Sequence, residues 1–239
     1  VTGVQTCALP ISSIQTDRPV TEEILTQLPH TLSLAVGAMT FGIIFGLLFG
    51  VIAGMTKNRL LENSIVVGAI VAVSMPVYWL AILLLMVFGV QLRWVSVTGG
   101  TGWQDAILPI FALGIGVAAV ITRLTQANIQ EIMHEDFVRT ARAKGLRQQR
   151  IRFWHILRNA LIPVVTIISL QFAGLLGGAF FVEAVFSRPG LGRYAIDAIG
   201  NRDYPQIQGM VMFLAVVYVL VNLLNDLFYA LLDPRVRFD

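Results

Sequence analysis

Few residues of this 239-residue chain have the types and spacing that chemistry requires. The only cysteine is Cys7, which excludes zinc-finger and disulfide frameworks. The sequence has no Gly-x-x-x-x-Gly-Lys-Ser/Thr loop, so it contains no P-loop nucleotide site. His30, His134 and His155 lie at or beyond the ends of the apolar segments, which disfavours an intramembrane Ser–His or metal centre. We predict a protein that is not an enzyme and has no catalytic residue, metal or cofactor.

Polar side chains inside the last apolar segment form the group most able to bind an ion. Asn222, Asn225 and Asp226 stand at i, i+3 and i+4, so they share one helix face. A carboxylate at membrane depth is costly and should face protein or water. Two interpretations stay open: a structural polar clamp, with Arg123 as one partner, and a proton or ion site. Gln171 is predicted to hydrogen-bond to a neighbouring helix.

Two groups of glycines can bring helices together or line a pore. Glycines at four-residue spacing lie on one helix face and let a neighbouring backbone approach closely. The first group is Gly42, Gly46, Gly50 and Gly54, and the second is Gly174 and Gly178 with Gly177 beside them. We predict tight helix packing for both groups. The alternative, a smooth pore wall, suits the second group better.

The elements that carry these residues are predicted membrane spans. The chain is 56% hydrophobic and 13% charged, with a mean hydropathy of +0.75, whereas a soluble domain has about 25% charged residues. Its apolar residues fall into blocks of roughly twenty, the length of a helix that crosses a bilayer. The blocks cover residues 31–55, 64–90, 106–126, 160–182 and 209–232. We predict an all-α polytopic transmembrane bundle, kinked at Pro76 in the second span, where the kink is either a gate or a static bend.

Basic residues predict the orientation of the spans, because Lys and Arg accumulate on the cytoplasmic side. Most of them lie in the connection 56–63, in the stretch 123–159 and after residue 232, which predicts a cytoplasmic C-terminus. Counting back through five spans places residues 12–29 outside the cell, so we expect that a first transmembrane helix has been lost. Residues 1–11 resemble the translation of a sequencing-library adapter and are left out of the fold prediction.

The connection 127–159 is too long for a simple loop. Acidic residues come first and basic residues follow up to Gly145, which matches a helix macrodipole and a C-terminal stop. A second amphipathic run then leads into the next span. Three interpretations stay open: a helix on anionic headgroups, a nucleic-acid site, which the membrane setting disfavours, and a docking element for a soluble partner. The apolar docking contacts would be Phe137, Val138 and Ala141.

The same connection resembles a known motif. Residues 139–146, Arg-Thr-Ala-Arg-Ala-Lys-Gly-Leu, and residues 157–164, Leu-Arg-Asn-Ala-Leu-Ile-Pro-Val, are similar to the coupling motif of ABC importer permeases. The general motif has Glu, Ile and a final Pro where this chain has Arg139, His155 and Arg158. These departures match the variant found in the dipeptide/oligopeptide/nickel permease family.

Further segments extend the resemblance to the first, or B-type, permease subunit of that family. Residues 181–208 and the tail 221–235 are similar to the outer loop and C-terminal end of its members. The outer loop 183–208 reads as a short helix between turns, with Arg193 and Asp197 able to pair, and would cap the pore or meet a binding protein.

This resemblance implies a fold, partners and a mechanism. The fold would be the type I ABC importer permease fold over residues 30–239, with five of six spans present. The partners would be a second homologous permease, two ABC ATPases, an extracytoplasmic binding protein and the lipid bilayer of a bacterial or archaeal cytoplasmic membrane, without nucleic acid. The ATPase-coupling residues would be Asp136, Phe137, Val138, Arg139, Thr140, Ala141, Arg142, Ala143, Lys144 and Gly145.

The implied function is the substrate pathway of an ATP-driven importer for peptides or a related small solute such as a nickel chelate. The sequence does not choose among these substrates. The alternative is a secondary transporter driven by an ion gradient. That class has inverted repeats and buried coupling-ion acids, whereas Asp226 is the only acid well inside a predicted span.

Overall fold

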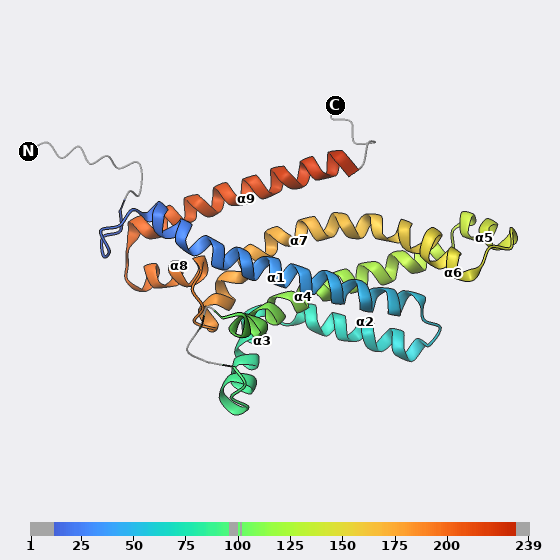
Figure 1. Cartoon of the computed structure of the whole chain (residues 1–239), viewed down its shortest axis with the longest axis horizontal. Helices are drawn as coiled ribbons and strands as arrows, with labels where there is room; N and C mark the ends of the chain where they lie inside the picture. The colour runs from blue at the N-terminus through green and yellow to red at the C-terminus, as the bar shows by residue number, and fades with distance from the viewer. Residues whose placement is uncertain (1–11, 96–99, 101, 233–239) are drawn as a thin grey trace, which may run out of the picture. The chain divides into compact units, whose positions relative to one another are not determined.

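The computed structural model describes residues 12–95, 100 and 102–232, and its long elements are all helices (Figure 1). The leader 1–11, with Cys7, lies outside the described residues. The α-helices are α1 (Val20–Met55), α2 (Arg59–Ser74), α3 (Val77–Leu84), α4 (Trp103–Met133), α5 (Asp136–Ala143), α6 (Gln148–Arg150), α7 (Arg158–Val185), α8 (Leu191–Gly200) and α9 (Tyr204–Leu232). Two π-helical segments are also present: Leu85–Gln91 follows α3, and Ile151–Leu157 follows α6.

Four helical stretches of the described chain are long and apolar enough to cross a membrane. They are Val20–Met55, Trp103–Met133, Gln148–Phe172 and Tyr204–Leu223. A fifth span is possible if α2 and the stretch Val77–Gln91 count as one broken span. The prediction of an all-helical, multi-span membrane protein is therefore confirmed.

The second predicted span is broken at Pro76 and not merely kinked. Its two halves meet with a bend of 100°. Met75, just before the proline, has an extended backbone with φ −82° and ψ 125°. The proline ring disfavours the helical conformation in the preceding residue, so the helix ends instead of bending.

The described helices belong to two compact units. Unit 1 contains Val1–Leu34, Ala81–Pro109 and Leu176–Asp239, and unit 2 contains Ala35–Leu80 and Ile110–Leu175. In unit 1 the core joins the beginnings of α1 and α9 to α8 through the buried residues Val20, Ile24, Leu191 and Met210. This core holds the connection between α7 and α9 against the start of α1.

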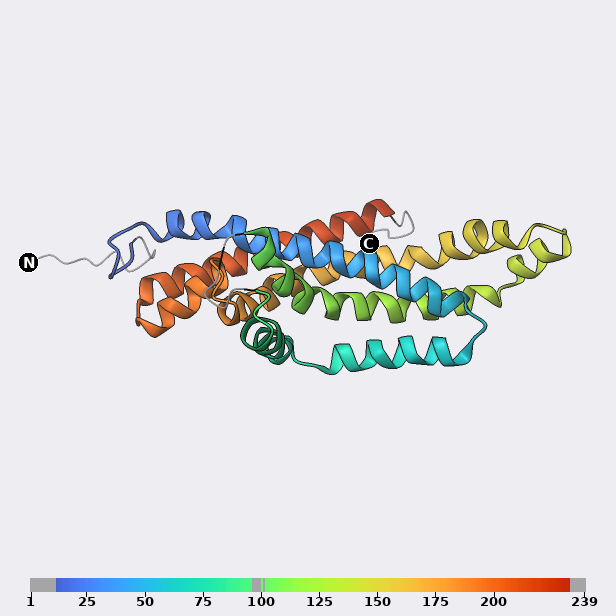
Figure 2. The same ribbon diagram turned by 60° about the horizontal axis from the view of Figure 1, so that its bottom comes forward.

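In unit 2, α1 runs beside α4 (Figures 1 and 2), and the glycines of α1 pack directly on α4. The contacts pair Gly42 with Val117, Gly46 with Ile121, Gly50 with Thr125, and Gly54 with Ile129. Both members of each pair advance by four residues, so α1 and α4 run in the same direction. A Cβ on Gly46 or Gly50 would lie 2.9 Å from a backbone oxygen of α4. The helices therefore approach to a distance that only glycine permits.

Candidate functional site

The segment between α4 and α7, residues 134–157, is here called the α4–α7 loop and contains α5. Helix α4 continues to Met133 and α5 begins at Asp136, so only two residues separate the two helices. After α5, Gly145 has φ +72°, a left-handed conformation that favours glycine. Gly145 therefore lets the chain turn sharply from α5 into α6.

One face of α5 is buried within this chain. Val138 is 0% exposed and Ala141 is almost fully buried. Both belong to a cluster that we call the loop core: Ile129, Val138, Ala141, Ile151, Ile156 and Ala160. Val138 and Ala141, which the sequence predicts as docking contacts, are therefore buried within this chain, because the amphipathic face of α5 packs on its own α4 and α7.

The π-helical segment Ile151–Leu157 explains how the loop core closes. In an α-helix, residues five apart lie on different faces, whereas π-helical i→i+5 bonding brings them into line. Ile151 and Ile156 are both about 2% exposed and both lie in the loop core. The segment then continues without interruption into α7, so α5 is attached to a transmembrane helix through packed side chains.

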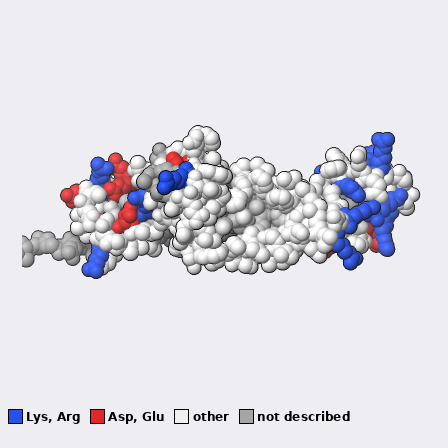
Figure 3. Space-filling model, turned by 90° about the horizontal axis from the view of Figure 1, so that it is seen from below, with Lys and Arg blue, Asp and Glu red and all other residues white. Residues whose placement is uncertain are grey.

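The opposite face of α5 is exposed and carries one large apolar side chain. Phe137 is 42% exposed and lies in the first turn. Arg139 and Asp136 form an exposed ion pair with 3.8 Å between nitrogen and oxygen, which contributes little to stability. In Figure 3 the charged side chains around α5 and α6 are mostly basic. The exposed face is therefore a basic surface around one aromatic side chain.

A mixed polar cavity lies between the α4–α7 loop and the turn after α1. Its volume is about 290 Å³, and its lining includes the basic residues Lys57, Arg142 and Arg152. Lys57 belongs to the α1–α2 connection, so this connection adds positive charge to the basic surface of the loop.

Polar contacts that sequence reasoning missed join the helices of unit 2. Glu62 of α2 accepts hydrogen bonds from Gln126 of α4, at 3.0 Å, and from Gln130. Asn128 of α4 donates to the carbonyl of Ala160 at 3.1 Å, which ties α4 to the start of α7. The i, i+4 spacing of Gln126 and Gln130 was a signal for a shared face, but nothing in the sequence indicated that Glu62 would meet them.

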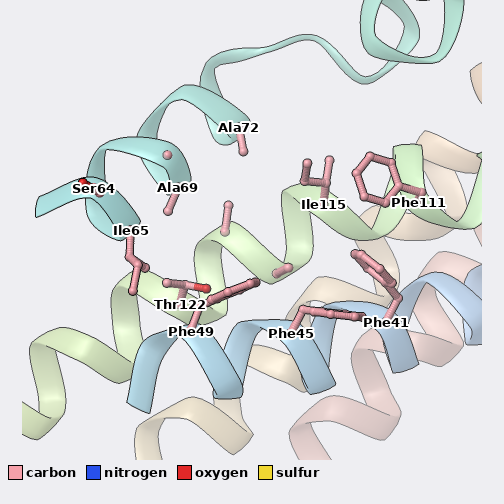
Figure 4. Close-up of a pocket in the computed structure, with 13 residues that line it drawn as sticks. Phe41, Phe45, Phe49, Ser64, Ile65, Ala69, Ala72, Phe111, Ile115 and Thr122 are labelled. Carbon is pink, nitrogen blue, oxygen red and sulfur yellow. The ribbon is translucent and has the colours of Figure 1, made fainter. Parts of the chain in front are cut away.

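An apolar cavity of about 460 Å³ lies between α1, α2 and α4 of unit 2 (Figure 4). Phe41, Phe45 and Phe49 line it from α1. Its two hydroxyls are already bonded to backbone carbonyls, Ser64 to Leu60 and Thr122 to Gly46. The cavity therefore suits apolar groups and offers no polar side chain to a peptide.

The glycines of α7 have surroundings unlike those of α1. A Cβ on Gly174 or Gly177 would meet no other heavy atom within 4 Å in the described chain. Gly178 is half-buried. Gly174 and Gly177 therefore leave an open face on α7 among the described residues, where the sequence predicts helix packing or a pore wall.

The predicted intramembrane polar group is only partly described. Asn222 donates to the carbonyl of Tyr218 in its own helix at 2.9 Å. The side chains of Asn225 and Asp226 lie outside the described residues, as does any pairing of Asp226 with Arg123. Gln171 is partly exposed on α7.

The connection between α7 and α9 contains α8 and begins at residue 186. Arg193 and Asp197 of α8 pair at 3.7 Å, at the predicted i, i+4 spacing. Asp203, just before α9, accepts the Ser13 hydroxyl at 2.6 Å and the backbone N–H of Gln206 at 3.3 Å. Burial raises the pKa of the Asp203 carboxyl, but these hydrogen bonds outweigh burial, so its pKa lies below the ordinary value.

Comparison with known proteins decides the family. The model of the family described as "Binding-protein-dependent transport system inner membrane component" matches residues 46–238. This chain belongs to that family. It is 42% identical over 226 residues to the glutathione transport system permease protein GsiC of Escherichia coli strain K12, covering 95% of this chain and 74% of that protein. It is 40% identical to GsiC of Salmonella choleraesuis, with the same coverage.

Solved structures agree on the fold. The MetNI methionine ABC transporter in an inward-facing conformation matches with a TM-score of 0.72 and 18% identity, covering 90% of this chain and 98% of that chain. An amino acid ABC transporter with histidines matches with a TM-score of 0.69 and 19% identity, covering 87% of this chain and 93% of that chain. The type I importer permease fold predicted from the sequence is confirmed.

These comparisons settle the class of function. The chain is a permease subunit of an ABC importer, a multi-pass protein of a bacterial inner-membrane transporter family, and it is not itself catalytic. The ion-coupled secondary transporter is therefore not its function. Family membership also implies ATPase and binding-protein partners.

Proposed function

We propose that this chain and a second permease form the pathway for a short peptide, driven by two ATPases that contact α5. The relatives named as glutathione permeases, 42% identical over nearly the whole chain, support a peptide substrate. Glutathione is a small, charged tripeptide, so a pathway for it needs polar groups. The two hydroxyls in the apolar cavity of unit 2 are already bonded to backbone carbonyls, so we propose the open face of α7 as the pathway instead.

The loop core carries the proposal for coupling. It contains residues of α4, α5 and α7, and Val51 and Met55 at the end of α1 pack against it. Because protein interiors are close-packed, a displacement of α5 is transmitted to these helices instead of being absorbed. Closure of the ATPases would thus move α1, α4 and α7 together, as a rigid-body switch between two packed states.

The exposed face of α5 is the proposed docking surface. Phe137 would enter an apolar pocket of the ATPase, as aromatic anchors do at the centres of interfaces. The basic residues around it would orient the contact by attracting acidic side chains. Val138 and Ala141 would act from the other side, by holding α5 in place on the loop core.

The basic surface also supports the proposed orientation. Lys57, the basic residues of the α4–α7 loop and the C-terminus would be cytoplasmic, because Lys and Arg are retained on that side. The connection that contains α8 would then face the binding protein. Cysteine labelling of whole cells from the outside tests this: residues of α8 should react and residues of α5 should not.

The test of coupling is Phe137→Asp in the reconstituted importer. We expect ATP hydrolysis to continue while ATP-driven uptake falls about tenfold or more, because losing a hot-spot aromatic removes over about 1.4 kcal/mol of contact. Phe153→Asp is the matched control, since Phe153 is an exposed phenylalanine of the same loop but not of α5. Normal coupling in Phe137→Asp, or equal loss in both variants, contradicts docking through α5.

The test of substrate uses the same vesicles with the cognate binding protein. We expect uptake of labelled glutathione or another short peptide that needs ATP and is unaffected by an uncoupler. Uptake of a nickel chelate in place of peptides would contradict the peptide assignment and leave the ATP-driven mechanism standing.

A further inference from the structure

A fully buried carboxylate lies near the end of α7, outside the coupling site. Glu183 is 0% exposed. Its Oε2 accepts the backbone N–H of Gly192 in the first turn of α8 at 2.7 Å. Arg188, also buried, supplies positive charge nearby and donates to the carbonyl of Gly100 at 3.3 Å. The other carboxylate oxygen, Glu183 Oε1, has no hydrogen-bond partner among the described residues, so these contacts compensate only part of the hydration that the buried carboxylate loses.

Helix α1 contributes a second acceptor to the same end of α8. The Thr31 hydroxyl accepts the N–H of Leu191 at 2.8 Å and also interacts with the Glu183 carboxylate. The first N–H groups of a helix have no partner within it, and a side chain at the N-cap usually accepts one of them. The N-cap of α8 is Gly190, which has no side chain. The cap is therefore supplied by α1 and α7.

Two glycines make this arrangement possible. A Cβ on Gly190 would collide with the carboxylate of Glu183, and a Cβ on Gly192 would collide with the backbone of Phe180. Gly200, at the other end of α8, has nothing within 4 Å of the same position. The demand for glycine is thus confined to the end of α8 that Glu183 holds.

Further hydrogen bonds fasten the same helices. The Tyr194 hydroxyl of α8 donates to Glu23 of α1 at 2.8 Å, and burial together with this carboxylate raises the pKa of Tyr194. Gln206 of α9 donates to the same Glu23 oxygen at 3.0 Å. All of these residues belong to unit 1, so α8 is attached to α1 at two separate points.

We infer that Glu183 is a positioning residue for transport: its carboxylate caps α8 and locks it to α1 and α7, so that the three move as one body. Loss of the lock would leave α8 mobile while α5 and its loop core stay intact. ATP would then be hydrolysed without productive transfer of solute. This consequence for uptake rests on the proposed function, whereas the lock itself does not.

The first test measures the mobility of α8 without transport. A nitroxide spin label on Ile199→Cys, 61% exposed on α8, is placed in the full chain with Cys7→Ser. Glu183→Ala should increase label mobility. Glu183→Gln should preserve wild-type mobility, because its carbonyl still accepts the Gly192 N–H. Gly190→Ala should also increase mobility, and it serves the test even if Glu183→Ala protein is not obtained, because it displaces the carboxylate without removing it.

A double-mutant cycle separates the lock from general damage. Glu183→Ala with Gly190→Ala should be no more mobile than Glu183→Ala alone, since the new methyl group no longer meets a carboxylate. Gly200→Ala is the matched control and should match wild type. Unchanged mobility in Glu183→Ala or in Gly190→Ala, or additive effects in the double variant, overturns the inference.

The second test measures uptake per ATP hydrolysed in vesicles. Glu183→Ala should lower this ratio about tenfold, the scale of losing one hydrogen bond to a charged group, and Glu183→Gln should restore most of it. A mobile α8 with normal uptake per ATP overturns the positioning role. Absence of ATP-driven uptake in the wild-type importer counts against the proposed function only, because the mobility cycle still decides the lock.

Discussion

The glycines of α1 and the glycines of α7 share a sequence pattern but differ in what surrounds them. Along α1, the space beside each of the four glycines is occupied by a residue of α4: Val117, Ile121, Thr125 and Ile129. Along α7, Gly174 and Gly177 meet nothing within 4 Å in the described chain. A small-residue face brings backbones together only where a second helix is available to occupy it.

This difference separates a contact inside the chain from a surface offered to something else. The face of α1 is a permanent helix–helix contact, because backbone atoms of α4 lie against it. The face of α7 at Gly174 and Gly177 is open among the described residues, which agrees with the proposed contact with a second permease or passage of solute. Substitutions at equivalent positions should therefore have opposite consequences for folding and for transport.

The largest effect is expected for Gly50→Leu on α1. A Cβ at this position lies 2.6 Å from the Cβ of Thr125 and 2.9 Å from the carbonyl oxygen of Thr122. A backbone oxygen cannot rotate away, so the two helices must separate, at a cost of about 3 kcal/mol or more. Fluorescence-detected size-exclusion chromatography should show loss of monodisperse protein.

Gly116→Leu on α4 is the control for that prediction, since Gly116 has no atom within 4 Å of a new Cβ. It should leave the elution profile unchanged. An equal loss of monodisperse protein in Gly50→Leu and Gly116→Leu would mean that contact at the Cβ position does not decide which glycines tolerate substitution.

The next effect is expected for Gly177→Leu on α7, and it should fall on transport. The added side chain enters open space, so the free energy of unfolding should change by no more than about 0.5 kcal/mol, as for a typical surface substitution. The melting temperature should therefore stay close to that of the wild type. Under the proposed function a second permease or the solute would occupy this face in the assembled importer, so ATP-driven uptake should fall strongly. A large drop in melting temperature with normal uptake would show instead that α7 packs within its own chain.

A smaller, graded effect should appear within the α1 ladder. A Cβ on Gly50 lies 2.6 Å from the Cβ of Thr125 and 2.9 Å from a backbone oxygen, whereas the nearest atom to a Cβ on Gly54 is the Cβ of Ile129 at 2.9 Å. A Cβ is fixed to its backbone, so both variants push the helices apart, but Gly54→Ala needs the smaller shift, and the helix preference of alanine over glycine, about 1 kcal/mol, offsets part of its cost. Gly50→Ala should lower the melting temperature clearly. A lower melting temperature for Gly54→Ala than for Gly50→Ala would mean that the closeness of the two helices does not determine the loss of stability.

The smallest effect is expected for Thr122→Val, which keeps the shape of the contact and removes one hydrogen bond. The Thr122 hydroxyl donates to the Gly46 carbonyl at 3.3 Å. Interhelical hydrogen bonds within membranes contribute about 0.6 kcal/mol on average. The free energy of unfolding, measured by thermal unfolding, should fall by no more than this amount. A loss as large as that of Gly50→Leu would mean that hydrogen bonding, and not packing, stabilises the contact.

Much of the fold and part of the site were predictable from single elements. The apolar blocks gave the spans because a helix in lipid must be apolar around its whole circumference. Gly145 was predicted as the end of α5, and it has the left-handed backbone that favours glycine. The sequence predicts a kink at Pro76, whereas the helix ends there, because the proline ring keeps Met75 out of the helical conformation.

The sequence by itself determined features that depend on local chemistry or on composition. These include the membrane class, the C-terminal end of α5, the glycine spacing of α1 and the motif of the importer family. Tertiary structure alone decided which face of α5 is free, which glycines are filled, and that Glu183 caps α8 from another helix. An amphipathic helix or a row of glycines specifies that a face will be covered, but residues far away in the chain decide what covers it.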